Sequence, residues 1–109
     1  MNVFKKFRRV QYLASNHAVF RCKKRTNILP SYARENIQNF CRNGEVLLEV
    51  DDYRYIRFKD DEYDLFFPCI KWNENAWVVK TTMRWEMVAH RLQNIIDNYH
   101  LNNFEVSAY

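Results

Sequence analysis

The spacing of apolar residues changes twice along this chain, and each change predicts a change of secondary structure. In the N-terminal part apolar residues recur at helical spacing, as at Ala33, Ile37 and Phe40. Over residues 45–83 apolar and polar residues alternate, which is the spacing of strands that bury one face. The helical spacing then returns. Helices grouped around an antiparallel sheet in this way predict an α+β fold.

Capping and turn residues predict the helix ends. Ser15 or Asn16 is expected to cap a first helix that continues to about Asn27, because short polar side chains accept hydrogen bonds from the first free N–H groups of a helix. Pro30 or the serine after it is expected to begin a second helix, since proline fits a first helical turn. Gly44, the only glycine, is expected to end that helix in a left-handed backbone conformation.

The alternating region predicts a four-stranded antiparallel meander, with strands over 46–50, 53–59, 65–72 and 76–83. Asp51 and Asp52 are expected to form a two-residue turn between the first two of these strands. Pro68 lacks a backbone donor and therefore predicts an edge strand or a bulge. A last helix of about four turns is expected over 84–99, where a broad apolar stripe recurs at helical spacing.

The interpretation is a single domain over residues 1–109. Two N-terminal helices pack on the four-stranded sheet, a basic segment 1–14 precedes them, and helix 84–99 is added at the end. Hydrophobic residues make up 48% of the chain and aromatic residues 17%, which suits a compact core at this length. Because no apolar run approaches about 18 residues and no signal peptide is recognised, a cytoplasmic protein without a membrane partner is expected.

Three cysteines, Cys22, Cys41 and Cys69, are widely spaced and form no Cys-x-x-Cys pair. Together with the three histidines they match no known zinc spacing. Reduced and mostly buried thiols are therefore expected. The sequence predicts no metal site and no cofactor.

Basic residues gather at the N-terminal end. Residues 1–34 hold nine lysines and arginines and not one Asp or Glu, whereas acidic residues are concentrated over 49–64. Such asymmetry favours contact with a polyanion, for which RNA is the first candidate. The alternative is a solvated basic face without a ligand.

The first predicted helix carries a histidine and two arginines in one row. His17, Arg21 and Arg25 are four residues apart, so they share a helix face. Histidine exchanges a proton near neutral pH, and arginine presents a planar fork to phosphate oxygens. Attack of an RNA 2′-hydroxyl on the adjacent phosphate needs a base, cations and an acid. The row therefore suggests RNA cleavage without a metal ion.

The run His17-Ala18-x-x-Arg21-x-x-x-Arg25, the helix that ends near Asn43-Gly44 and the following meander resemble the BrnT- and RelE-type toxins. The helical histidine and the two arginines are also similar to those of RegB-type phage endoribonucleases. The resemblance covers about residues 15–83. It implies two helices packed on an antiparallel sheet, metal-independent cleavage of RNA, and a protein antitoxin as a further partner.

Carried over to this chain, the resemblance implies that His17 transfers a proton or orients the 2′-hydroxyl. It also implies that Arg21 and Arg25 contact phosphate. A short threonine-containing signature ends the last strand in these families, which here implies a role for Thr81 or its neighbour Lys80. The expected catalytic set is His17, Arg21, Arg25 and Thr81.

One face of the predicted strand 53–59 is a second candidate surface. Tyr53, Tyr55, Arg57 and Lys59 alternate along it, and aromatic rings interleaved with cations can stack on splayed bases. The alternative is an ordinary solvent-facing strand. Tyr55 and Lys59 are also the candidates for a second proton carrier. The expected RNA-contacting set is Lys23, Lys24, Tyr55, Arg57, Lys59 and Lys80.

Three functions remain open from the sequence. The first is a metal-independent endoribonuclease of the toxin or phage-regulator type. The second is a nucleic-acid-binding regulator that uses the same surface without cleavage. The third is a small inhibitor that binds a host protein through its last helix or its acidic stretch 49–64. For the apolar residues of the last helix, core packing is favoured over a partner-binding stripe.

Overall fold

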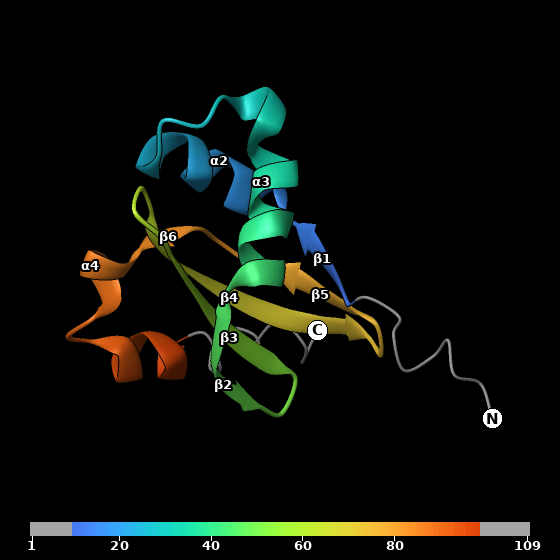
Figure 1. Cartoon of the computed structure of the whole chain (residues 1–109). Helices are drawn as coiled ribbons and strands as arrows, with labels where there is room; N and C mark the ends of the chain where they lie inside the picture. The colour runs from blue at the N-terminus through green and yellow to red at the C-terminus, as the bar shows by residue number, and fades with distance from the viewer. Residues whose placement is uncertain (1–9, 99–109) are drawn as a thin grey trace.

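A mixed β-sheet of six strands forms the centre of the structure, a computed structural model that describes residues 10–98 (Figure 1). The strands are β1 (Gln11–Ala14), β2 (Glu45–Val50), β3 (Tyr53–Lys59), β4 (Asp64–Asn73), β5 (Ala76–Val79) and β6 (Met83–Arg84). The helices are α2 (Asn16–Arg25), α3 (Pro30–Asn43) and α4 (Trp85–Val88), and a further helical segment covers 92–98. The fold is α+β.

The strands lie in the order β1-β5-β4-β3-β2, and β6 pairs with β4. The predicted antiparallel meander is present in β2 to β5, with Ile56 opposite Phe67 in its central pair. β1 lies parallel to β5, with Gln11 opposite Ala76. The sheet is therefore mixed, and the prediction of four antiparallel strands is wrong at this edge. The alternation in β1 covers only four residues, which is too short to distinguish from a loop by pattern.

Helices α2 and α3 cover one face of the sheet (Figure 1). Ser15 caps α2 as expected, because its Oγ accepts from the backbone N of Ala18 at 3.0 Å. The helix ends at Arg25, two residues before the predicted end, and α3 begins at Pro30. The first core contains, among others, Ala18, Cys22, Ala33, Ile37 and Phe40 from the helices and Ile56, Phe67 and Val79 from the sheet.

The opposite face of the sheet carries a second core. Tyr55 and Phe66 are buried there against Val88 and Ile96 from the C-terminal segments. The predicted continuous last helix is wrong, because α4 ends at Val88 and helical structure resumes at residue 92. Both segments still place their apolar side chains on the same sheet face. Core packing of the apolar stripe is thus confirmed, and residue 99 lies outside the described residues.

Pro68 lies inside the sheet, so the prediction of an edge strand or a bulge at this residue is wrong. β4 runs between β3 on one side and β5 and β6 on the other, and Pro68 is buried opposite Tyr55. The Pro68 carbonyl accepts from the backbone N of Lys80 at 2.8 Å. Because the N and O of one strand residue face the same side, its nitrogen faces residues 80–82, between β5 and β6. Among the described residues no strand pairs with β4 at that point, so proline costs no ladder hydrogen bond there.

Gly44 ends α3 as predicted, but not in a left-handed conformation. Its φ is −81° and its ψ is 173°, which is extended backbone that any residue adopts. Glycine is required instead because there is no space for a side chain at this position. A Cβ at this position would lie 2.6 Å from Cγ2 of Ile56 and 2.9 Å from the carbonyl oxygens of Arg57 and Phe40. Only a residue without a side chain lets β3 approach the end of α3 this closely.

The three cysteines are free and buried, as predicted. Burial raises the pKa of the Cys22 thiol and, more strongly, that of Cys41. These thiols are therefore protonated at neutral pH and behave as small apolar side chains. Across residues 10–98, every helix is too short or too polar to cross a bilayer.

Candidate functional site

The histidine and the two arginines of the motif lie in one row on α2. His17 is exposed, whereas Arg21 and Arg25 are half-buried. Ala18 and Cys22, on the adjacent helix stripe, point into the first core and thereby fix the rotation of the helix. The row is therefore open to solvent at its histidine end and meets the rest of the protein at its second arginine.

The segment 80–82, which links β5 to β6, is tied to α2 by three hydrogen bonds. Ser15 Oγ donates to the carbonyl oxygen of Lys80 at 3.1 Å, and Thr82 Oγ1 donates to the carbonyl oxygen of Ala18 at 2.9 Å. At the far end of the helix, Arg25 Nη1 donates to the carbonyl oxygen of Thr82 at 2.8 Å. The structure thus brings together α2 and the threonine-containing segment, although more than 50 residues separate them.

Both threonines of this segment are buried. Thr82 is fully buried, and Thr81 keeps only 2% of its surface exposed. The hydroxyl of Thr82 donates a hydrogen bond to the Ala18 carbonyl of α2, as described above. The expected position of Thr81 in an open site is therefore not found, and its hydroxyl is not presented to solvent. Lys80 is half-buried beside the helix cap.

An exposed aromatic ring on α2 adds to the row. Phe20 keeps 49% of its surface exposed. The guanidinium carbon of Arg21 lies 5.7 Å from its ring centroid, and Nζ of Lys24 lies 4.7 Å from it. Lys23 and Lys24 are both exposed in the last turn. This combination of a ring and cations on one helix was visible in the spacing of Phe20 and Lys24, but only the basic residues suggested a role there.

The strand face of β3 is not the open surface that the sequence predicts. Tyr55 is fully buried in the second core, stacked on Phe66 with ring centroids 6.1 Å apart. Arg57 donates from Nε and Nη2 to the two carboxylate oxygens of Asp64, both at 2.9 Å, and its guanidinium carbon lies 4.0 Å from the ring centroid of Trp85. The hydrogen bonds from Arg57 lower the pKa of Asp64. The positive charge of Arg57 is thereby balanced by Asp64 within the protein.

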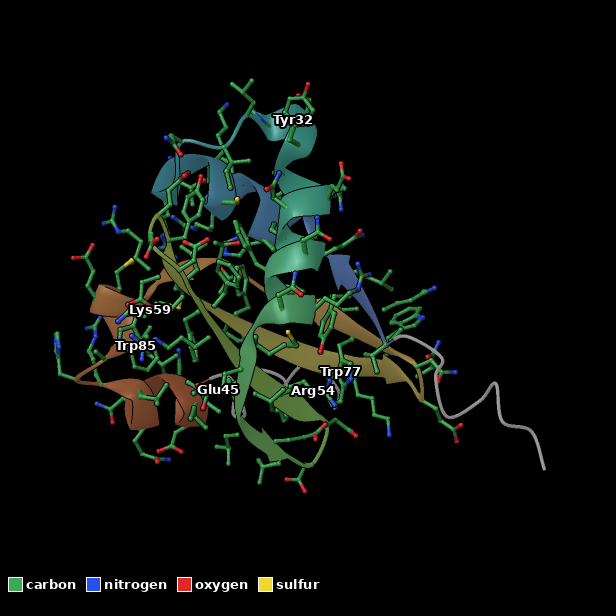
Figure 2. The ribbon with its side chains drawn as sticks, in the orientation of Figure 1. Tyr32, Glu45, Arg54, Lys59, Trp77 and Trp85 are labelled. Atoms are coloured by element: carbon green, nitrogen blue, oxygen red, sulfur yellow. The ribbon has the colours of Figure 1, made fainter. Side chains whose placement is uncertain are left out.

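Lys59 remains exposed at the end of β3, where Figure 2 labels it. It lines a shallow hollow of about 210 Å³ together with Arg57 and the residues at the end of α3. The row on α2 lines none of this hollow. Of the six expected RNA-contacting residues, Lys23, Lys24 and Lys80 lie on or beside α2 and Arg57 and Lys59 line this separate hollow, whereas Tyr55 is buried.

A larger pocket, of about 520 Å³, begins where the row on α2 ends. Its walls come from three segments: 25–27 at the end of α2, 62–65 at the start of β4, and 84–86 at the start of α4. Arg25 belongs both to the row and to the pocket. The sequence pattern did not indicate this pocket, because its three walls lie far apart along the chain.

Hydrogen bonds and charges organise the pocket walls. Tyr63 Oη donates to Oδ1 of Asn27 at 3.0 Å, which joins the start of β4 to the end of α2. The carboxylate of Glu62 raises the pKa of Tyr63 to about 12, so the phenol stays protonated at neutral pH. Arg84 Nε lies 3.1 Å from Oε1 of Glu86 in an exposed ion pair. The pocket therefore combines aromatic rings, cations and carboxylates.

Comparisons of this chain with protein-family models, with curated proteins and with solved structures found no match. Within residues 10–98, the histidine, cysteine and acidic side chains form no group of three or more that could hold a metal ion.

Proposed function

We propose that this protein is an endoribonuclease that binds RNA along α2 and cleaves it by attack of a 2′-hydroxyl. The observation that carries the proposal is the row of His17, Arg21 and Arg25. The imidazole is exposed at one end of the row, and Arg25 is anchored to the Thr82 carbonyl at the other. The resemblance of this row to the motif of BrnT-, RelE- and RegB-type proteins supports the same function.

The chemistry follows from the residue types. In the proposed reaction, the neutral imidazole of His17 takes the proton of a ribose 2′-hydroxyl. The 2′ oxygen then forms a bond to the adjacent phosphorus, and the bond from phosphorus to the 5′ oxygen breaks. Arg21 and Arg25 stabilise the negative charge on the phosphate oxygens in the transition state. The 5′ oxygen takes a proton from the imidazolium or from water, and the other product ends in a 2′,3′-cyclic phosphate.

The direct test is incubation of the purified protein with end-labelled single-stranded RNA. Wild-type protein is expected to release products that end in a cyclic phosphate, at a rate that EDTA does not change. His17→Ala is expected to lower the rate by at least about 100-fold, the usual contribution of a general base. His90→Ala is the matched control, because His90 is exposed on the turn after α4. Equal cleavage by wild type and His17→Ala would refute the assignment of the base.

A second candidate function is RNA binding without cleavage. Phe20, with Arg21 and Lys24 close to its ring, offers a stacking surface and cations that need no proton transfer. Tyr55, one of two expected second proton carriers, is buried. This candidate requires binding that weakens steeply with salt, because released counterions drive it, together with intact RNA after long incubation. Binding that does not change when the salt concentration is raised several-fold would exclude it.

A further inference from the structure

The pocket at the end of α2 has the size and the walls of a ligand site. Its volume of about 520 Å³ lies within the range of about 300–1,000 Å³ that is typical of small-molecule sites. It is continuous with the proposed RNA path, because Arg25 lies at the end of the row on α2 and also lines the pocket. A nucleotide bound along α2 can therefore reach the pocket without leaving the protein surface.

Two aromatic side chains line the pocket, and both are held in place. Tyr63 is fixed by its hydrogen bond to Asn27. Trp85, labelled in Figure 2 at the start of α4, has the guanidinium of Arg57 4.0 Å from its ring centroid and packs against the second core. Asp64 in turn fixes Arg57 through two hydrogen bonds. Such preorganised rings suit contact with a planar group.

The carboxylates in the pocket favour a group that donates hydrogen bonds. Glu62, Asp64 and Glu86 all line the pocket, and an ionised carboxylate only accepts hydrogen bonds. Arg25 and Arg84 also line the pocket, but Arg25 donates to the Thr82 carbonyl and Arg84 is paired with Glu86. A planar group that donates hydrogen bonds to the carboxylates therefore suits these walls, while the phosphates lie along the arginines of α2. Among nucleobases, guanine, adenine and cytosine carry an exocyclic amino group, whereas the pairing edge of uracil has two carbonyl oxygens on either side of one N–H.

We propose that this pocket binds one unpaired base of the RNA and prefers a base that carries an amino group over uracil. This inference rests on the proposed RNA-binding function of α2. The base packs against Tyr63 and Trp85, and its amino group donates to Glu62 or Glu86. The pocket therefore supplies the sequence preference, while the row on α2 supplies the affinity for the backbone.

The test uses 2′-O-methyl RNA hexamers, which cannot be cleaved by 2′-hydroxyl attack. One position is varied among the four bases and the other five are uridine, and fluorescence anisotropy gives the Kd for each hexamer. The wild-type protein is expected to bind each of the three hexamers that carry guanine, adenine or cytosine at least about fivefold more tightly than the all-uridine hexamer. The double variant Glu62→Gln, Glu86→Gln is expected to reduce this ratio to below about twofold. Glu74→Gln, an exposed acidic side chain in the turn between β4 and β5, is expected to leave the ratio unchanged.

The outcomes separate the two proposals. If no hexamer binds to the wild-type protein, the RNA-binding function itself fails. If all four hexamers bind equally, RNA binding stands and the base pocket is refuted. The pocket is also refuted if the double variant lowers the Kd of every hexamer by the same factor, because the carboxylates of the pocket would then act only through long-range repulsion. Thermal unfolding of each variant checks that the exposed Glu→Gln changes preserve the fold.

Discussion

Replacing Gly44 with alanine tests whether space, rather than backbone conformation, demands glycine at the end of α3. The new Cβ would lie 2.6 Å from a methyl carbon of Ile56 and 2.9 Å from two backbone carbonyl oxygens. The methyl group can move by a rotation of its side chain, but the oxygens belong to β3 and α3 and can move only with those elements. The alanine therefore forces a strand and a helix apart by a few tenths of an ångström.

The expected cost follows from these contacts. Overpacking of this kind destabilises by about 1–3 kcal/mol, and the smaller conformational freedom of alanine in the unfolded chain offsets about 0.4–1 kcal/mol of it. The net loss is about 1–2 kcal/mol, which corresponds to a fall in Tm of roughly 4–9 °C for a domain of this size. Thermal unfolding followed by circular dichroism measures the shift. Asn39→Ala, an exposed change on the same helix, is expected to change stability by no more than about 0.5 kcal/mol.

A second variant separates the two explanations. If glycine were needed for a left-handed conformation, Gly44→Asn would be better tolerated than Gly44→Ala, because asparagine adopts that conformation more readily. The steric explanation gives the opposite order, since asparagine is the larger side chain. A Gly44→Asn protein more stable than Gly44→Ala, or an unchanged Tm in Gly44→Ala, would refute the reasoning.

Three further predictions concern polar contacts. Arg54→Met should lower the free energy of unfolding by about 1.5–3 kcal/mol in urea titrations, because it removes charged hydrogen bonds to side chains of β1 and β2 and a cation over a tryptophan ring; an unchanged urea midpoint would contradict this. Asp64→Asn should cost less than about 1 kcal/mol at neutral pH. Because Arg57 lowers the pKa of Asp64 from 3.8, the stabilisation is fully present above pH 3.8 and is lost as the pH falls through the lower folded pKa. Plots of the free energy of unfolding against pH for the wild type and for Asp64→Asn should therefore converge there. Tyr63 should ionise near pH 12 in an NMR titration, and Glu62→Gln should move that pKa down towards 10.0; a pKa that does not respond would exclude the carboxylate as its cause.

Local signals in the sequence predicted local structure well. The cap at Ser15, the start of α3 at Pro30 and the inward helix stripes all depend on residues within a few positions of one another, and all are present. The two faces of β3 were also assigned correctly, with Ile56 in one core and Tyr55 on the other side. Alternation does not reveal that both faces are covered, however. Tyr55 was therefore expected at the surface and is buried instead.

The features that the sequence did not reveal depend on distant partners. β1 is a strand because β5 offers it an edge, and residues 11 and 76 meet only in the folded chain. Pro68 is tolerated because the segment beside it, residues 80–82, is not a strand, which no local pattern records. The pocket at the end of α2 needs three segments to come together. Of the candidate site, the row on α2 was thus predictable, whereas its neighbours were not.

The attachment of α2 to residues 80–82 has a consequence for how the protein matures on the ribosome. Helix α2 is synthesised early, but the strand beside β1 and the carbonyl that receives Arg25 emerge about 50–65 residues later. Contacts of such long sequence separation form late in folding. A nascent or truncated chain that stops before β5 therefore exposes the basic helix without its hydrogen bonds to residues 80–82. The arginines acquire their final arrangement only when nearly the whole domain has been translated.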